Sequence, residues 1–342
     1  MLMFARLMVG GFVLSAIAGH ALAADATLTI HHFLSPKSET HKSFIVPWAK
    51  RIEQQSQGRI KFEIFPSMAM GGKPPELYRQ VRDGTADIIW TLIGYTPGVF
   101  PRSEVFELPT IHRGSAAATN QAIQENFGLV AEDYKDLQPI LVHVHAGNAI
   151  HMRTKAVRQV SDLRGLKLRT PSRTGAWLIQ ALGAEPVGMP VPALPQALSK
   201  GVVDGALVPF EILLPLKLPQ LTRYSIEGAD NSRFGTSVFL FAMNKERYKA
   251  LPADLRAIID ANSGAGIAKA VGEMWDNIEE PGKVAQEKSG GEVIKLDEVT
   301  KGTFDALGAT VVRRWLGEAK ARGIDGAALV KAVRTSMEKF SR

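Results

Sequence analysis

The sequence of 342 residues contains no cysteine. This absence excludes disulfide bonds, thiolate metal sites and a cysteine nucleophile, so the stability of the fold must come from burial. The sequence also lacks a basic cluster, because its 41 lysine and arginine residues are spread along the whole chain. A nucleic-acid surface requires such clustering, so the net charge of +7 does not predict a nucleic-acid partner.

Motifs of the common enzyme classes are missing as well. The sequence has no G-x-S-x-G elbow, no P-loop, no H-E-x-x-H and no glycine-rich dinucleotide fingerprint in its first βα unit. Three acids, Glu76, Asp87 and Asp204, each fall where a helix cap or a strand-end turn explains them. We therefore expect neither catalysis nor a cofactor.

The N-terminus has the pattern of a secretory signal. Arg6 is the only charged residue before Asp25, and the apolar run 7–18 is followed by Ala-Leu-Ala at 21–23. We expect residues 1–24 to be the signal peptide, cleaved after Ala23 or Ala24. The alternative, a membrane anchor, is less favoured because the apolar run is short for a span of about 20 residues. No later segment is long and apolar enough to predict a membrane span.

The rest of the chain alternates between strand and helix patterns. Thr27–Ile30 alternates polar and apolar residues, Ser43–Gln57 has an apolar helical face, and Ala86–Ile93 is an almost continuous apolar run. Further strands are expected at 60–64, 139–145, 166–168, 202–208, 234–243 and 293–296, and further helices at 74–84, 115–135, 172–182 and 192–200. This order predicts an α/β fold with mainly parallel sheets. For this length, two smaller sheets facing each other across a cleft fit better than one open sheet.

One strand end carries the residues that best indicate a function. Arg169 ends the strand that contains Leu166 and Leu168, and Ser172 is expected to cap the helix that follows. Ligands of open α/β sheets bind at the carboxyl ends of strands, and a guanidinium beside free helix N–H groups suits a carboxylate. These residues alone leave a surface arginine in an exposed turn as an equal alternative.

Several segments together carry a resemblance to a known family. They are Gly58-Arg59-Ile60 running to Phe65-Pro66, Met70-Gly71-Gly72, 81–88 (VRDGTADI), 106–109 (FELP), 162–169 (DLRGLKLR) and 197–206 (ALSKGVVDGA). In this order, and over most of the chain after residue 24, the sequence resembles the DctP-type solute receptors of tripartite ATP-independent periplasmic (TRAP) transporters.

The resemblance implies two α/β lobes, joined by crossing strands and a long helix, that close on a ligand between them. It implies a periplasmic receptor whose Arg169 pairs with a ligand carboxylate, and which delivers a small organic acid to TRAP membrane permease subunits. We expect one lobe to comprise 25–147 plus about 230–280, and the other 148–229 plus about 281–342.

Two departures from the family pattern bear on the ligand. Where the family commonly has Glu-Asn-Pro, this chain has Leu207-Val208-Pro209 followed by Phe210, so an amide is replaced by an apolar side chain. A second arginine of the sugar-acid receptors would fall at Ala149, with Asn148 and His151 beside it. We therefore expect an aromatic or largely apolar monocarboxylate. The alternative is a sugar acid or a hydroxy acid.

Further candidate ligand contacts are aromatic or imidazole side chains near strand ends. They are His31, His32, Phe33, Trp90, Tyr95 and His145. Because His143 and His145 share one face of a strand, a metal-binding periplasmic receptor using these two residues with His31 and His32 is a less favoured alternative. No cysteine or suitably spaced carboxylate accompanies them, so no metal is expected.

Overall fold

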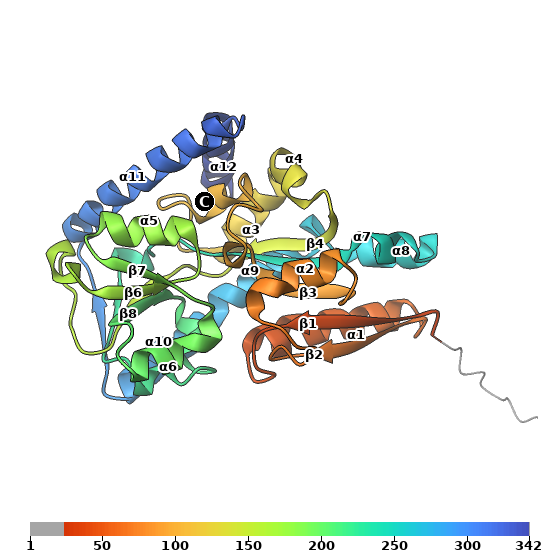
Figure 1. The fold of residues 1–342 in the computed structure, drawn as a ribbon, viewed down its shortest axis with the longest axis horizontal. Helices are drawn as coiled ribbons and strands as arrows, with labels where there is room; N and C mark the ends of the chain where they lie inside the picture. The colour runs from red at the N-terminus through yellow and green to blue at the C-terminus, as the bar shows by residue number, and fades with distance from the viewer. Residues whose placement is uncertain (1–23, 342) are drawn as a thin grey trace, which may run out of the picture.

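The computed structural model describes residues 24–341, which form two mixed β-sheets flanked by helices (Figure 1). Of the predicted signal segment 1–24, only Ala24 belongs to the described residues. Ala23 lies outside them. The first sheet has the order β2-β1-β3-β10-β4, with β1 (Ala26–His32), β2 (Ile60–Phe65), β3 (Ile88–Leu92), β4 (Leu137–Val144) and β10 (Val238–Asn244). The second has the order β11-β9-β5-β8-β6-β7, with β5 (Ala149–Met152), β6 (Lys167–Thr170), β7 (Glu185–Gly188), β8 (Gly205–Val208), β9 (Tyr224–Glu227) and β11 (Glu292–Lys295).

Each sheet combines parallel strands with one antiparallel strand in its interior. β1 is parallel to β2 and β3, and β6 is parallel to β7 and β8. β10 runs antiparallel to both β3 and β4, and β5 runs antiparallel to both β8 and β9. The chain enters these two strands when it passes from one sheet to the other. The predicted two-lobed α/β architecture is confirmed, with these crossing strands making both sheets mixed.

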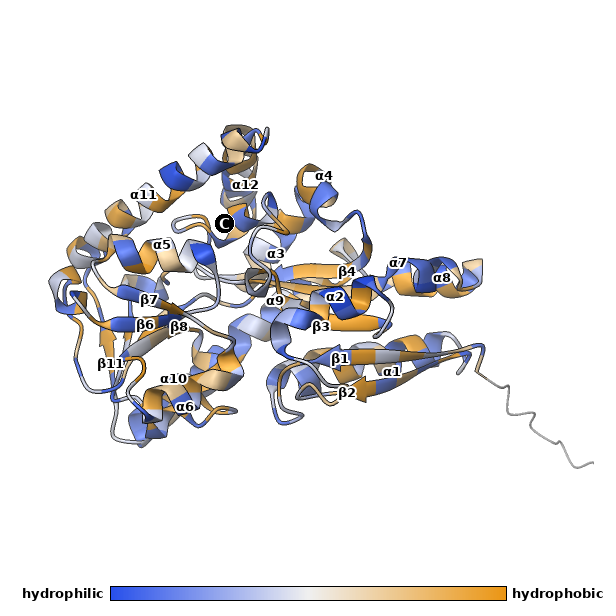
Figure 2. Ribbon diagram, in the orientation of Figure 1, coloured by the Kyte–Doolittle hydropathy of each residue, from blue (hydrophilic) through white to orange (hydrophobic). Residues whose placement is uncertain are grey.

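The helices cover the sheets and connect the two lobes. They are α1 (Val46–Gln55), α2 (Leu77–Arg82), α3 (Ala116–Glu125), α4 (Phe127–Val130), α5 (Arg173–Ala181), α6 (Leu194–Ser199), α7 (Lys245–Lys249), α8 (Ala253–Ala261), α9 (Ala265–Asn277), α10 (Glu279–Lys288), α11 (Glu298–Ala321) and α12 (Gly326–Phe340). In Figure 2 the strands β3 and β4 are mostly orange, whereas α2, α7 and α8 show blue residues on their outer sides. Every residue of β3 is buried, in agreement with the apolar run in the sequence.

The predicted long connecting helix is present in two parts. α9 packs on α3 beside the first sheet, and α10, which follows after Ile278, packs on the 3-10 turn η8 (Phe210–Leu213) beside the second. α11 lies along α5 (Figure 1), but α12 packs on α3 of the first lobe. The segment 281–342, which we predicted for the second lobe, therefore contributes α12 to the first lobe.

The helix expected at 115–135 is shorter than predicted. Asn126 ends α3, and its Nδ2 donates hydrogen bonds to the carbonyl oxygen of Ala122 and to Oγ of Ser336, both at 2.8 Å. Ser336 belongs to α12, so a residue more than 200 positions away fixes this helix end. Among residues 24–341, no helix combines the length and apolar character that a membrane crossing needs.

The contact between α9 and α3 generates a stability prediction. A Cβ on Gly272 of α9 would lie only 2.4 Å from Cα of Ala117, whereas a Cβ on Gly317 of α11 would meet nothing within 4 Å. Gly272→Ala should lower the free energy of unfolding by about 1–3 kcal/mol through overpacking. Gly317→Ala, the matched control, should raise it by about 0.5–1 kcal/mol through helix propensity. Urea unfolding measures both, and equal effects of the two substitutions would contradict the close packing.

Candidate functional site

A cavity lies between the two sheets, with walls from both lobes. Seven of the residues predicted from the sequence line it, namely Phe33, Trp90, Tyr95, His145, Asn148, Arg169 and Val208. It encloses about 360 Å³ of empty space, the open solvent at its mouth included. The lining residues come from strand ends and crossing segments, the places where such folds bind ligands.

Arg169 contributes the cavity's positive charge. Its side chain is buried, with the residue only 2% exposed, and it lies on β6 just before the helix α5 that Ser172 caps. Nε donates a hydrogen bond to the carbonyl oxygen of Met189 at 2.9 Å, and Nη1 donates one to that of Leu207 at 3.3 Å. Burial lowers the pKa of Arg169, but a guanidinium remains charged at neutral pH.

No carboxylate within residues 24–341 pairs with this charge. None of the ion pairs formed within residues 24–341 includes Arg169, and its hydrogen-bond partners are two carbonyl oxygens and the hydroxyl of Tyr95. A buried charge without a counterion is unfavourable by several kcal/mol. The arrangement is therefore complementary to an anion that enters the cavity.

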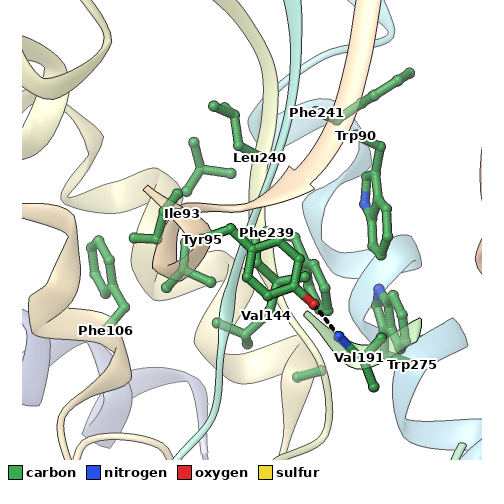
Figure 3. Close-up of a cluster of buried hydrophobic side chains, with 14 of the residues drawn as sticks. Trp90, Ile93, Tyr95, Phe106, Val144, Val191, Phe239, Leu240, Phe241 and Trp275 are labelled. Atoms are coloured by element: carbon green, nitrogen blue, oxygen red, sulfur yellow. Dashed lines mark hydrogen bonds between the residues drawn. The ribbon is translucent and has the colours of Figure 1, made fainter. Parts of the chain in front are cut away.

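Tyr95 links the two lobes beside this arginine. Its hydroxyl accepts a hydrogen bond from the backbone N–H of Val191 at 2.9 Å, drawn as the dashed line in Figure 3, and lies 3.5 Å from Nη2 of Arg169. Tyr95 follows β3 of the first lobe, whereas Val191 and Arg169 belong to the second. Burial raises the pKa of Tyr95, so its phenol stays protonated. The described arrangement is thus the closed one.

An ion pair also holds the lobes together. Arg173, at the start of α5, donates from Nε and Nη2 to the two carboxylate oxygens of Glu104 at 2.5 and 2.6 Å. Next to it, Oγ1 of Thr174 donates a hydrogen bond to Oε2 of Glu107 at 2.9 Å. Burial raises the pKa of Glu107 to about 7. The N-terminal turn of the helix that follows Arg169 is therefore fixed to the first lobe.

Aromatic rings form the apolar wall of the cavity. Trp90 stacks on Phe239 with ring centroids 4.5 Å apart, and Phe239 stacks on Trp275 at 5.3 Å (Figure 3). Phe33 also stacks on Trp90, with ring centroids 5.1 Å apart. Nε1 of Trp90 donates a hydrogen bond to Nε2 of His143 at 3.0 Å, so the indole's polar atom is satisfied. A flat apolar ligand would meet a rigid surface here.

Polar atoms of the first crossing segment also lie at the cavity. Nδ1 of His145 accepts a hydrogen bond from the N–H of Gly147 at 2.9 Å. Burial, followed by the nearby His112 and His143, lowers the pKa of His145 well below its usual value. The neutral ring therefore carries its proton on Nε2. Oδ1 of Asn148 is buried and has no hydrogen-bond partner among residues 24–341.

Four predicted contacts are not among the cavity-lining residues. Nδ1 of His31 pairs with Oε1 of Gln80 at 2.7 Å, and Nε2 of His32 pairs with Nδ1 of His41 at 3.0 Å. The other two, His151 and Phe210, pack edge-to-face on each other with ring centroids 5.0 Å apart. Residues 24–341 contain no group of three or more metal-ligating side chains. The histidines that were considered for a metal are thus engaged in separate contacts.

Several lining residues were missed in the sequence. They are Leu34, Leu92, Pro171, Val191, Pro209, Glu211, Ile212, Ser237 and Phe239. Glu211 carried a usable signal, because it is the only charged residue in an apolar run that extends from Leu207 to Leu216. Ser237 and Phe239 carried none, because they reach the cavity only through the return of β10 to the first sheet.

Comparison with known proteins identifies the family. Residues 30–318 match the family described as bacterial extracellular solute-binding protein, family 7. The chain belongs to this family. It is therefore a TRAP solute-binding protein rather than an enzyme, and it acts outside the cytoplasm with TRAP membrane permeases. The resemblance seen in the sequence is confirmed.

Solved structures of TRAP solute-binding proteins are similar to this receptor over nearly its whole length. A marine metagenome protein specific for aromatic acids, in complex with 3-hydroxybenzoate, is 40% identical, with 94% of this chain and 100% of that one covered and a TM-score of 0.91. One from Rhodoferax ferrireducens with benzoate is 38% identical, with 92% and 98% covered and a TM-score of 0.90. One from Bordetella bronchiseptica with mandelate is 25% identical, with 92% and 99% covered and a TM-score of 0.85.

The close approach of the lobes generates a prediction about closure. A Cβ on Gly94, beside Tyr95, would lie 2.7 Å from Cβ of Ser172 in the other lobe. Gly94→Ala should disfavour the closed receptor and weaken binding of benzoate, used as the probe, by about tenfold or more. Calorimetry measures the affinity, and small-angle scattering measures the compaction that ligand causes. Gly128→Ala, where a Cβ meets nothing within 4 Å, is the control. Unchanged affinity and compaction in Gly94→Ala would contradict the prediction.

Proposed function

We propose that this receptor binds an aromatic monocarboxylate, with the carboxylate on Arg169 and the ring in the apolar part of the cavity. The observation that carries the proposal is the buried guanidinium of Arg169, which has no carboxylate partner among the described residues and faces an aromatic-lined cavity. The ligand anion supplies the missing countercharge, and delivery to the permease follows from the family.

Arg169 and Tyr95 together can hold the carboxylate. The planar guanidinium presents donors that match two carboxylate oxygens at once. The hydroxyl of Tyr95 accepts from Val191, so its own proton is available for a ligand oxygen. Because this hydroxyl also joins the lobes, a ligand held by both side chains would favour the closed receptor over the open one.

The rest of the cavity favours one carboxylate over several polar groups. Val208, where the family commonly has an asparagine, lines the cavity, and Ala149, at the place of a second arginine, is buried in β5 without lining it. A sugar acid would leave several hydroxyls without partners on such walls, at about 1–3 kcal/mol for each group. Aromatic and apolar walls instead favour a ring. The relatives solved with 3-hydroxybenzoate, benzoate and mandelate support this choice.

We also propose that the receptor reaches the periplasm through cleavage of its N-terminal signal after Ala23 or Ala24. In the structure β1 begins at Ala26, so either cleavage would leave the first sheet whole. Mass spectrometry of the exported protein would identify the new N-terminus. An uncut N-terminus on the exported chain would contradict this part of the proposal.

Replacing the arginine tests the proposed function. Arg169→Met keeps an apolar stem of similar length but removes the charge, so we expect benzoate affinity to fall at least about 100-fold, as for truncation of one partner of a buried pair. Arg169→Lys should recover only part of it, because an ammonium cannot form the two-point contact. Calorimetry with benzoate and with neutral benzamide measures both affinities.

Benzamide serves as the internal control in this experiment. The unmodified receptor should prefer benzoate strongly, and Arg169→Met should bind the two compounds about equally, because only the charge distinguishes them. Full benzoate affinity in a folded Arg169→Met receptor would remove the arginine from the site. Tighter binding of a sugar acid than of every aromatic acid tested would overturn the assignment of the ligand class.

A further inference from the structure

Glu211 is the only acidic residue among those that line the cavity in residues 24–341. It is 5% exposed, and its Oε2 atom is buried without a hydrogen-bond partner in the described part of the chain. A buried polar atom left unpaired is unfavourable by about 1–3 kcal/mol. Nothing in the binding of a carboxylate by Arg169 accounts for an acid at this place.

Contacts with α10 fix the backbone around Glu211. The backbone N–H groups of Glu211 and Phe210 donate to the carboxylate of Glu279 at the start of α10, at 3.0 and 3.3 Å. α10 approaches this turn closely at Gly282, where a Cβ would lie 2.1 Å from the carbonyl oxygen of Phe210. The turn η8 therefore holds Glu211 at the cavity wall.

The cations near this turn are committed to other acids. Arg233 donates from Nη1 to Glu227 at 2.6 Å and from Nη2 to Glu279 at 3.4 Å, and Lys283 also pairs with Glu227 at 2.8 Å. The charges that act on Glu211 are those of Glu279 and of Glu39, which is the N-cap residue of the π-helix η1 (Thr40–Ile45). Glu211 therefore sits in a negative environment and forms no ion pair within residues 24–341.

Burial, reinforced by the charges of Glu279 and Glu39, raises the pKa of Glu211 well above its ordinary value. A carboxyl group accepts hydrogen bonds in either form, and it also donates one when it is protonated. Such a group can pair with a hydroxyl, which also donates and accepts. A second ligand carboxylate would instead bring another negative charge next to Glu279 and Glu39.

We propose that Glu211 hydrogen-bonds a hydroxyl substituent on the ring of the bound acid, so that the receptor selects hydroxylated aromatic monocarboxylates. This assignment rests on the proposed function, because Arg169 has to hold the carboxylate while Glu211 contacts the ring substituent. Arg169 has Met189, Leu207 and Tyr95 as its partners, and Glu211 shares none of them. The two groups thus recognise different parts of one ligand.

Ligand selectivity of two variants tests the role of Glu211. The ligands are benzoate, 3-hydroxybenzoate, 4-hydroxybenzoate and isophthalate, measured by calorimetry at pH 7. The unmodified receptor should bind at least one hydroxybenzoate about tenfold or more tighter than benzoate, and isophthalate more weakly than benzoate. Glu211→Leu should bind benzoate and the hydroxybenzoates within about twofold of one another. Glu211→Gln should keep most of the preference, because an amide also donates and accepts.

Controls separate this role from a structural one. Glu280→Gln changes an exposed acid on α10 next to Glu279 and should leave all four affinities unchanged. If Glu211→Leu does not fold, the comparison of 3- and 4-hydroxybenzoate with their methoxy analogues on the unmodified receptor still decides. A methoxy oxygen cannot donate, so the proposal requires the methoxy acids to bind more weakly than the hydroxy acids.

The outcomes distinguish this inference from the proposed function. An unmodified receptor that binds benzoate through Arg169 but shows no preference for either hydroxybenzoate would overturn the role of Glu211 alone. A hydroxyl preference that persists in folded Glu211→Leu would do the same. Failure of every aromatic acid to bind, or full benzoate affinity in Arg169→Met, would instead overturn the proposed function beneath it.

Discussion

A positive charge buried among neutral acceptors is the constraint on which this molecule's binding site depends. Arg169 is held by the carbonyl oxygens of Met189 and Leu207, so its position is set by β6, β8 and the strand-end loop at 189. The hydroxyl of Tyr95 reaches it from the other lobe. The same few atoms therefore define where an anion can bind and where the two lobes meet. In the proposed function Tyr95 takes part in both ligand binding and closure, so the geometry would couple the two.

The rest of the cavity determines what accompanies that anion. Trp90, Phe239 and Phe33 supply stacked or tilted rings, and Val208 replaces a polar amide that is common in the family. Buried polar groups without a protein partner would then contribute to the choice of ligand. Each of them is energetically unfavourable until a ligand hydrogen-bonds to it. Oδ1 of Asn148 and Oε2 of Glu211 are such groups. In the proposed function, the specificity of the site would reside in these few polar atoms on mostly apolar walls.

Local patterns in the sequence placed the arginine at a strand end before a capped helix, and the family resemblance then singled it out as a ligand contact. Arg169 at a strand end and Ser172 as a helix cap are consequences of neighbouring residues, and the cap is present, with Oγ of Ser172 accepting from the N–H of Gly175. Seven predicted residues line the cavity, and most of them lie at or next to strand ends, which converge there. The pair His31 and His32 does not line the cavity, and these rings contact Gln80 and His41 instead. The end of α3 at Asn126 likewise depends on α12, which no local pattern reveals.

The place of β10 in the first sheet has a consequence for how the chain folds. This strand lies between β3 and β4 in the sheet and pairs with both. In the sequence, however, it begins almost a hundred residues after β4 ends, and most of the second lobe precedes it. During synthesis the first sheet therefore stays incomplete until residues 238–244 have been made. Sheets that rely on such distant pairing form slowly. Such a delay would favour a chain that crosses a membrane unfolded. The N-terminal half cannot complete its sheet before the C-terminal half is present.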